Sequence, residues 1–278
     1  MFAYSDLRQS LLQSGAAFAY GKLQNLPVLQ LAPVASQEKP AALPIPPRIK
    51  SASSAKTPSE ILAGFLGVPF REDGVIDEHG NFTLFSRPDT VFKEPGLNCS
   101  GFMLSASRLL LRKNIPLAAA ARDRMGDSGA GAALGRDWDF GWDVVLNTTQ
   151  GMERKLLLPD GAVADPAAGS GLAPLGFELH SPKTWQELPG RIRRNHLYFV
   201  SFSRTTKQRG YSLLHYHVGI LVRASDKDWH LYHSVKTSGV VRENMGNEQS
   251  LAKFLHTNRN VGDTNKHMFI VEVPCQTL

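Results

Sequence analysis

The sequence has few cysteines and no long apolar run. Its 278 residues include two cysteines, Cys99 and Cys275, and two thiols cannot build a disulfide framework or a four-cysteine zinc ribbon. No apolar stretch approaches the ~20 residues that a membrane-spanning helix needs. Charged residues make up 20% and hydrophobic residues 42% of the chain, which indicates a globular protein and excludes a disordered or collagen-like one. The chemistry of this protein must therefore depend on a local group of side chains.

The chain has a modest positive charge. The net charge is +6 and the sequence pI is about 9.4, a balance that favours anionic surroundings such as nucleic acid, phospholipid head groups or an acidic cell-wall polymer. The densest basic cluster, residues 191–194, has no interleaved aromatic residues and no nucleic-acid-binding motif. We therefore predict a solvated face there and no nucleic-acid partner.

Proline marks the first part of the chain as an extension. Six prolines fall between Pro27 and Pro47, where they remove backbone donors and disfavour helix in the residue before each of them. Residues 1–56 are therefore predicted to form an N-terminal extension and linker, and no signal-peptide pattern is visible in residues 1–26. An ordered domain is predicted over 57–278. It begins at Thr57-Pro58-Ser59-Glu60, which has the pattern of a helix capping box.

Helices precede strands in the predicted domain. Residues 100–113 form an amphipathic helix with cations near its C-terminal end, and residues 118–190, which are rich in Ala, Gly and Pro, are expected to be mainly an irregular insertion. Four later segments are rich in β-branched and aromatic residues, which predicts strands at 196–203, 211–222, 229–234 and 268–273. Helices followed by a run of strands favour an α+β fold over a doubly wound parallel sheet.

Cys99 is the residue that points most clearly to chemistry. It stands in Leu97-Asn98-Cys99-Ser100-Gly101-Phe102, at the start of the predicted helix. Free backbone N–H groups and the helix dipole at that end stabilise a thiolate and can donate to an oxyanion. A buried inert thiol is the ordinary alternative for a single cysteine, and the helix-start position favours the nucleophile. Cys275 is assigned no role.

The candidate base lies on a predicted strand. A nucleophilic thiol needs a base, which histidine supplies because its pKa is near neutrality. With the period of a strand, His215 and His217 face the same side as Gly219. His233 follows His217 by 16 residues (233 − 217). It can therefore lie on the adjacent antiparallel strand and hold the ring of the base in the useful tautomer. For His215 we favour a surface or hydrogen-bonded histidine.

Several segments resemble the NlpC-type family of papain-like cell-wall cysteine peptidases. Residues 98–102 are similar to the Asp-Cys-Ser-Gly-Phe/Leu signature of that family, and residues 217–220 to its His-Val-Gly-Ile/Met signature. Residues 232–234 resemble the segment that bears the third polar residue. In the expected chain order, residues 65–70 resemble Leu-Gly-x-Pro-Tyr, and residues 197–202 resemble the apolar strand before the histidine.

The resemblance implies a fold, an activity and roles for three residues. The implied fold is a papain-like α+β domain, in which the helix bearing the nucleophile packs on an antiparallel sheet. Cys99 is then the nucleophile, His217 the general base and His233 the orienting residue. The implied activity is that of a cysteine peptidase or amidase that cuts an amide bond in peptidoglycan stem peptides, without a metal or organic cofactor and in the periplasm or outside the cell.

Three features depart from the family pattern. Asn98 replaces an aspartate, Phe70 replaces a tyrosine whose hydroxyl lies near the site, and 118 residues (217 − 99) separate Cys99 from His217. The long separation matches the segment 118–190, which is expected to wall the substrate cleft. These departures bear on the substrate more than on the mechanism. Cysteine before histidine in the chain favours the peptidase branch over the permuted relatives that act on lipids.

Two other functions stay open on the sequence. His215, His217 and His233 supply three imidazoles, the number that a catalytic zinc ion with one open position takes, although zinc leaves the position of Cys99 unexplained. A catalytically inactive cell-wall-binding protein of the same fold is the other alternative. The carboxylates of Asp137, Asp139 and Asp143 are predicted to cap turns or to contact water.

Overall fold

The computed structural model describes residues 47–55, 57–129, 137–166, 176–205, 213–225 and 228–275. The chain divides into two units, Met1–Ala42 and Leu43–Leu278, and every described residue belongs to the second. Most of the predicted N-terminal extension, residues 1–46, therefore lies outside the described residues. No helix in the described ranges is long and apolar enough to cross a membrane.

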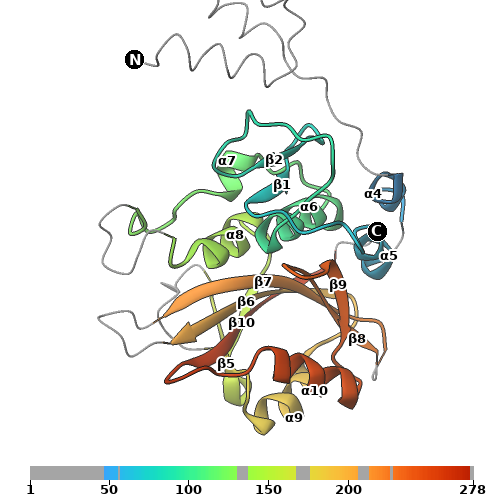
Figure 1. Ribbon diagram of the computed structural model, residues 1–278. Coiled ribbons are helices and arrows are strands. Elements are labelled where there is room, and N and C mark those ends of the chain that lie inside the picture. The colour runs from blue at the N-terminus through green and yellow to red at the C-terminus, as the bar shows by residue number, and fades with distance from the viewer. Residues whose placement is uncertain are drawn as a thin grey trace, which may run out of the picture. The chain divides into compact units, whose positions relative to one another are not determined.

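The described part of the chain mixes helices with antiparallel strands (Figure 1). The helices are α4 (Pro47–Ala52), α5 (Pro58–Ala63), α6 (Cys99–Leu110), α7 (Leu117–Ala120), α8 (Phe140–Thr148), the 3-10 helix Pro159–Gly161, α9 (Pro182–Arg191) and α10 (Glu248–Thr257). The strands are β1 (Gly74–Ile76), β2 (Phe82–Leu84), β3 (Lys155–Leu157), β4 (Val163–Ala164), β5 (Phe177–Glu178), β6 (His196–Thr205), β7 (Leu214–Arg223), β8 (Trp229–Val235), β9 (Gly239–Asn244) and β10 (Asn265–Pro274). The predicted α+β class is confirmed.

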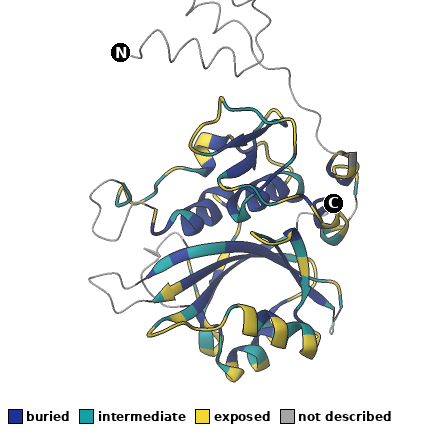
Figure 2. Cartoon of the chain, viewed as in Figure 1, coloured by how far each residue is buried: buried dark blue, intermediate teal, exposed yellow. Residues whose placement is uncertain are grey.

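One large sheet organises the fold. Its strands run in the order β4-β3-β10-β6-β7-β8-β9, with β5 also paired to β10, while β1 and β2 form a separate small sheet. Every strand pair in the described residues is antiparallel. Helices α6 and α8 cover one face of the large sheet, and α9 and α10 lie on the other (Figure 1). The central strands are buried on both faces (Figure 2), so two apolar cores form, one on each side.

The predicted helix start at Thr57 is present. The Thr57 hydroxyl accepts the Glu60 N–H, and the Glu60 carboxylate accepts the Thr57 N–H at 3.0 Å, which completes the capping box. Helix α4 lies upstream of this start, and its Ala52 packs so closely on α5 that a Cβ at Gly64 would lie 2.6 Å from the Ala52 Cβ. The fold therefore includes residues before 57. Pro47 occupies the first position of α4, where proline is tolerated in a helix.

Several described parts of the segment 118–190 belong to the core, and the expectation that the segment is mainly irregular is wrong for these parts. Helix α8 buries Trp142 against the large sheet, where its ring contacts His215 of β7 and Phe269 of β10. Strands β3 and β5 both pair with β10, in the registers Ile270↔Leu157 and Met268↔Phe177. Strands of two or three residues give little signal in a sequence, because their stability comes from the partner strand and not from propensity. Residues 130–136 and 167–175 lie outside the described residues.

Candidate active site

Cys99 is the first residue of helix α6. Asn98 precedes it as the N-cap, in extended conformation with φ −82° and ψ −176°, and its Oδ1 accepts the Gly101 N–H at 2.7 Å. The Asn98 N–H donates to the Gly74 carbonyl at 2.9 Å, which fixes the helix start against β1. Asparagine therefore provides the same cap as the aspartate of the family signature, and it places no negative charge beside the thiol.

Gly101 allows α6 to approach β1 closely. A Cβ at this position would lie 1.9 Å from the Gly74 carbonyl oxygen and 2.9 Å from the Val75 Cα, so a larger residue displaces the helix or the strand. The glycine two residues after Cys99 thus holds the start of the helix, and with it the thiol, in place.

His217 and His233 come from adjacent antiparallel strands, as predicted, with β7 paired to β8. The His217 Nε2 and His233 Nδ1 atoms are 2.7 Å apart, and the ring planes meet at 70°. His233 is only 4% exposed. A Cβ at Gly219 would lie 2.9 Å from the Tyr232 carbonyl and 3.2 Å from the His233 Cβ, so glycine at this position makes room for the pair.

A bulge in β7 separates His215 from His217. Phe202 pairs with His217 and Ser203 with His215, which leaves Tyr216 as an extra residue in β7. His215 stacks on Trp142 of α8, with ring centroids 5.7 Å apart, and its Nδ1 lies 2.9 Å from the Ser201 hydroxyl. The prediction that both histidines share one face is therefore wrong, because the bulge breaks the alternation of the strand. The hydrogen-bonded interpretation of His215 is confirmed.

The three histidines that the zinc alternative requires are consequently not brought together. His215 contacts Trp142 and Phe269, whereas His217 contacts Phe202 and His233. Within the described ranges no group of three or more His, Cys, Asp or Glu side chains is arranged to hold a metal ion.

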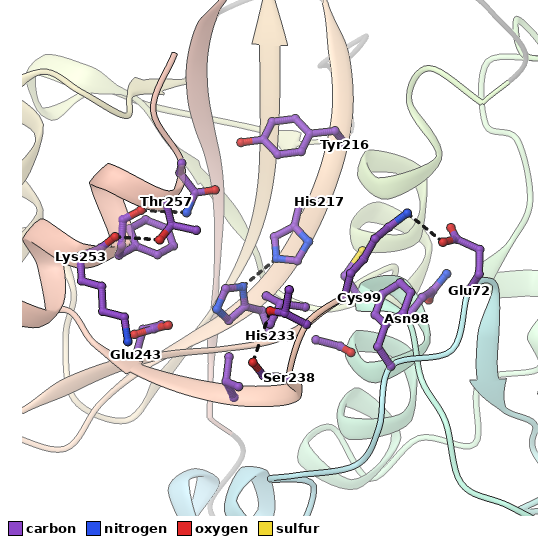
Figure 3. A pocket seen from close by; sticks show the side chains of 18 residues that line it. Glu72, Asn98, Cys99, Tyr216, His217, His233, Ser238, Glu243, Lys253 and Thr257 are labelled. Carbon is purple, nitrogen blue, oxygen red and sulfur yellow. Dashed lines mark hydrogen bonds and ion pairs between the residues drawn. The ribbon is translucent and has the colours of Figure 1, made fainter. Parts of the chain in front are cut away.

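One pocket joins the thiol to the histidine pair. A cavity of about 510 Å³ is lined by Cys99, His217 and His233, with further walls from the residues after α5, from β8 and β9, and from α10. Figure 3 shows Cys99 and His233 on opposite sides of the His217 ring. Nε2 of His217 bonds to His233, and Figure 3 shows the other ring nitrogen, Nδ1, on the side of Cys99.

Burial keeps the thiol and the imidazole neutral at pH 7. It raises the pKa of Cys99, while hydrogen bonds from the Val218 backbone, Ser100 and the Cys99 backbone act in the opposite direction. Burial lowers the pKa of His217 to about 4. Burial, and then the charge of His217, hold the pKa of His233 well below its ordinary value. The resting site is thus a thiol beside an uncharged imidazole, with backbone N–H groups directed at the sulfur.

Charged side chains at the pocket were not identified from the sequence. Glu72 and Lys236 form an ion pair of 3.0 Å between exposed side chains of the pocket wall, and Lys236 also lies 5.9 Å from the centre of the Phe70 ring. Glu243 and Lys253 line the side formed by β9 and α10. No motif marks these residues, because their proximity arises only when strands distant in the sequence pair.

A second pocket adjoins the first. It has a volume of about 620 Å³, shares Glu72 and Asn98 with the Cys99 pocket, and carries further carboxylates that include Asp137 and Asp143. Asp143 is buried in helix α8 and accepts the Arg124 N–H at 3.0 Å. Burial and then the neighbouring carboxylates raise the pKa of Asp143 to about 7, against a lowering by the Arg124 N–H. Cys275 lines neither pocket.

Comparison with known proteins identifies no relative. No family model matches the chain, and no match is found among the curated proteins or the solved structures.

Proposed function

We propose that this protein is a cysteine hydrolase with a papain-like fold, which cleaves an amide bond in peptidoglycan stem peptides through a thioester intermediate. The observation that carries the proposal is the convergence of Cys99, His217 and His233 on one pocket. A nucleophile, a base within reach and a third group that orients the base are the components that covalent acyl transfer needs. Helix α6, which bears the thiol, packs on an antiparallel sheet, and this arrangement supports the papain-like assignment.

The first half of the reaction forms a thioester. Cys99 Sγ attacks the carbonyl carbon of the scissile amide, and its proton passes to Nδ1 of His217. Because both groups are neutral at rest, the proton moves as the sulfur attacks. The negative charge that develops on the carbonyl oxygen is stabilised by N–H groups at the start of α6, among them that of Cys99. His217 then protonates the leaving amine, and the C–N bond breaks.

The second half restores the thiol. A water molecule gives a proton to His217 Nδ1 and attacks the thioester carbonyl. His217 returns that proton to the Cys99 sulfur as the C–S bond breaks, and a carboxylic acid is released. His233 accepts a hydrogen bond from Nε2–H of His217, which keeps Nδ1 free to take the proton in each half. No metal or organic cofactor is required by these steps.

The cell wall is the substrate that the sequence favours. The motifs around Cys99 and His217 resemble enzymes that act on peptidoglycan, and a net charge of +6 favours an anionic polymer. This substrate places the protein in the periplasm or outside the cell.

A digest of purified peptidoglycan tests the proposal. Wild-type protein and the Cys275→Ala variant are expected to release peptides with new amino and carboxyl ends, detected by mass spectrometry, and the Cys99→Ala variant is expected to release none. Cys275 lies outside the pocket, so it is the matched control for the loss of a thiol. Release of the same peptides by Cys99→Ala would contradict the assigned nucleophile. Binding of wild-type protein to the wall without cleavage would favour the inactive binding protein.

A further inference from the structure

His233 has a buried ring nitrogen without a hydrogen-bond partner. Its Nδ1 contacts His217 at 2.7 Å, whereas its Nε2 is buried and unpartnered, and the side chain as a whole is 4% exposed. Buried polar groups are nearly always paired, so a nitrogen of this kind requires an explanation. Its place in the pocket next to the proposed base makes a functional explanation worth testing.

The tautomers of the two histidines determine whether Nε2 of His233 is a hydrogen-bond donor or an acceptor. His217 serves as a base only if its Nδ1 carries no proton, and in the neutral ring the proton is then on Nε2. The His217 Nε2–H therefore donates to His233 Nδ1, and the proton of the neutral His233 ring must be on Nε2. The unpartnered atom is thus a buried N–H donor, and a side chain that forms a hydrogen bond with it has to be an acceptor.

We propose that Glu243 is a positioning residue whose carboxylate accepts the His233 Nε2–H, directly or through one water molecule, and so makes His217 a stronger base. In the pairing of β8 with β9, His233 lies opposite Val241 and Leu231 lies opposite Glu243. Glu243 is therefore a diagonal neighbour of His233 on the same face of the sheet, within reach of a long side chain. Both residues line the pocket, and Figure 3 shows Glu243 on the side of His233 away from His217.

The other charged groups around His233 do not serve as the acceptor. Lys253 of α10 shares this side of the pocket, but an ammonium group only donates. The carboxylate of Glu72 lies on the Cys99 side of the pocket (Figure 3) and is bound to Lys236 at 3.0 Å. No ion pair of Glu243 is found among the described residues, so its carboxylate is available for His233.

A carboxylate on His233 changes the strength of the base. When Glu243 accepts the Nε2–H, His233 Nδ1 becomes a better acceptor for His217, and the positive charge that His217 gains during attack is stabilised. The site then uses a chain of four groups, Cys99, His217, His233 and Glu243. This inference rests on the proposed cysteine hydrolase and adds the residue that sets the proton affinity of its base.

Alkylation of Cys99 by iodoacetamide, followed against pH by peptide mass spectrometry, tests the inference without a substrate. If His217 accepts the thiol proton, the negative thiolate raises the pKa of the neighbouring His217. Between the pKa of His217 beside the neutral thiol and its pKa beside the thiolate, the reactive thiolate–imidazolium pair keeps a constant population, and the labelling rate reaches a plateau. The height of that plateau rises tenfold for each unit of His217 pKa. We expect Glu243→Gln to lower the plateau about tenfold and Glu248→Gln, on the exposed first turn of α10, to leave it unchanged.

A double-mutant comparison separates this role from a general effect on the fold. Since Glu243 acts through His233, Glu243→Gln is expected to have no further effect on the plateau in a His233→Ala background. An unchanged plateau in Glu243→Gln, or an equal reduction with and without His233, would overturn the role of Glu243. Either result leaves the proposed hydrolase standing, provided that the wild type has a plateau that His217→Gln abolishes. Absence of that plateau in the wild type would refute both.

Discussion

Acidification should destabilise this protein through the pair formed by His217 and the buried His233. Burial lowers the pKa of His217 to about 4 in the folded protein, whereas an exposed histidine has a pKa of ~6.5. Between these values the unfolded chain binds more protons than the folded one, so the free energy of unfolding falls as the pH falls. Above pH ~7 both states are neutral at this position, and the contribution is constant.

The size of the effect follows from the difference between the two pKa values. A difference of about 2.5 units corresponds to at most about 3 kcal/mol of stability, and roughly 2 kcal/mol of this is lost between pH 7 and pH 5. His233 acts in the same direction, because burial and the charge of His217 also lower its pKa.

Urea unfolding of the wild type and of His217→Gln at both pH values measures this contribution. Glutamine removes the titrating group, so the variant is expected to lose about 2 kcal/mol less than the wild type over the same interval. The comparison uses the change with pH within each protein, which makes the starting stability of the variant unimportant. An equal loss in the two proteins would show that His217 is not buried as a neutral ring, and the account of the site would fail.

Three further predictions concern the cap of helix α6, the close approach of α6 to β1 and the roles of the two histidines. Asn98→Ala is expected to cost about 1 kcal/mol in urea unfolding through loss of the α6 cap, while Asn98→Asp retains most of that stability; equal losses would exclude the cap. Gly101→Ala should lower the thermal midpoint or prevent folding, because its Cβ would meet the Gly74 carbonyl at 1.9 Å; a normal midpoint would contradict that contact. On any peptide substrate that is found, His233→Ala should reduce kcat less than His217→Ala, since it only orients the base; the reverse order would exchange the two roles.

Regular periodicity made much of the central fold predictable. The strands expected at 196–203 and 229–234 appear as β6 and β8, and the helix expected at 100–113 appears as α6. Each of these segments combines strong local preference with a buried face, so local and tertiary signals agree. The adjacency of His217 and His233 was predictable for the same reason, since two strands close in sequence pair as antiparallel neighbours.

The bulge in β7, the short strands β3 and β5 and the position of Glu243 depend on contacts that no local sequence pattern encodes. The bulge at Tyr216 redirects His215 into the core, and an extra residue in a strand gives no signal in a sequence of regular alternation. Strands β3 and β5 are stabilised by β10, which lies about a hundred residues later in the chain. Glu243 reaches the site only because β9 pairs with β8.

The rate at which iodoacetamide labels Cys99, compared with Cys275 in the same sample, tests the central claim most directly. Burial raises the pKa of Cys275 to about 11, and Cys275 does not line the pocket that holds His217, so its labelling should fall about tenfold for each unit of decreasing pH. Cys99 in the wild type should instead show a plateau of labelling above the pKa of His217 beside the neutral thiol, because the thiolate holds the proton on the neighbouring imidazole. His217→Gln should give Cys99 the same steep dependence as Cys275. Parallel, steep pH dependences for both cysteines in the wild type would contradict the assignment of Cys99 and His217 as nucleophile and base.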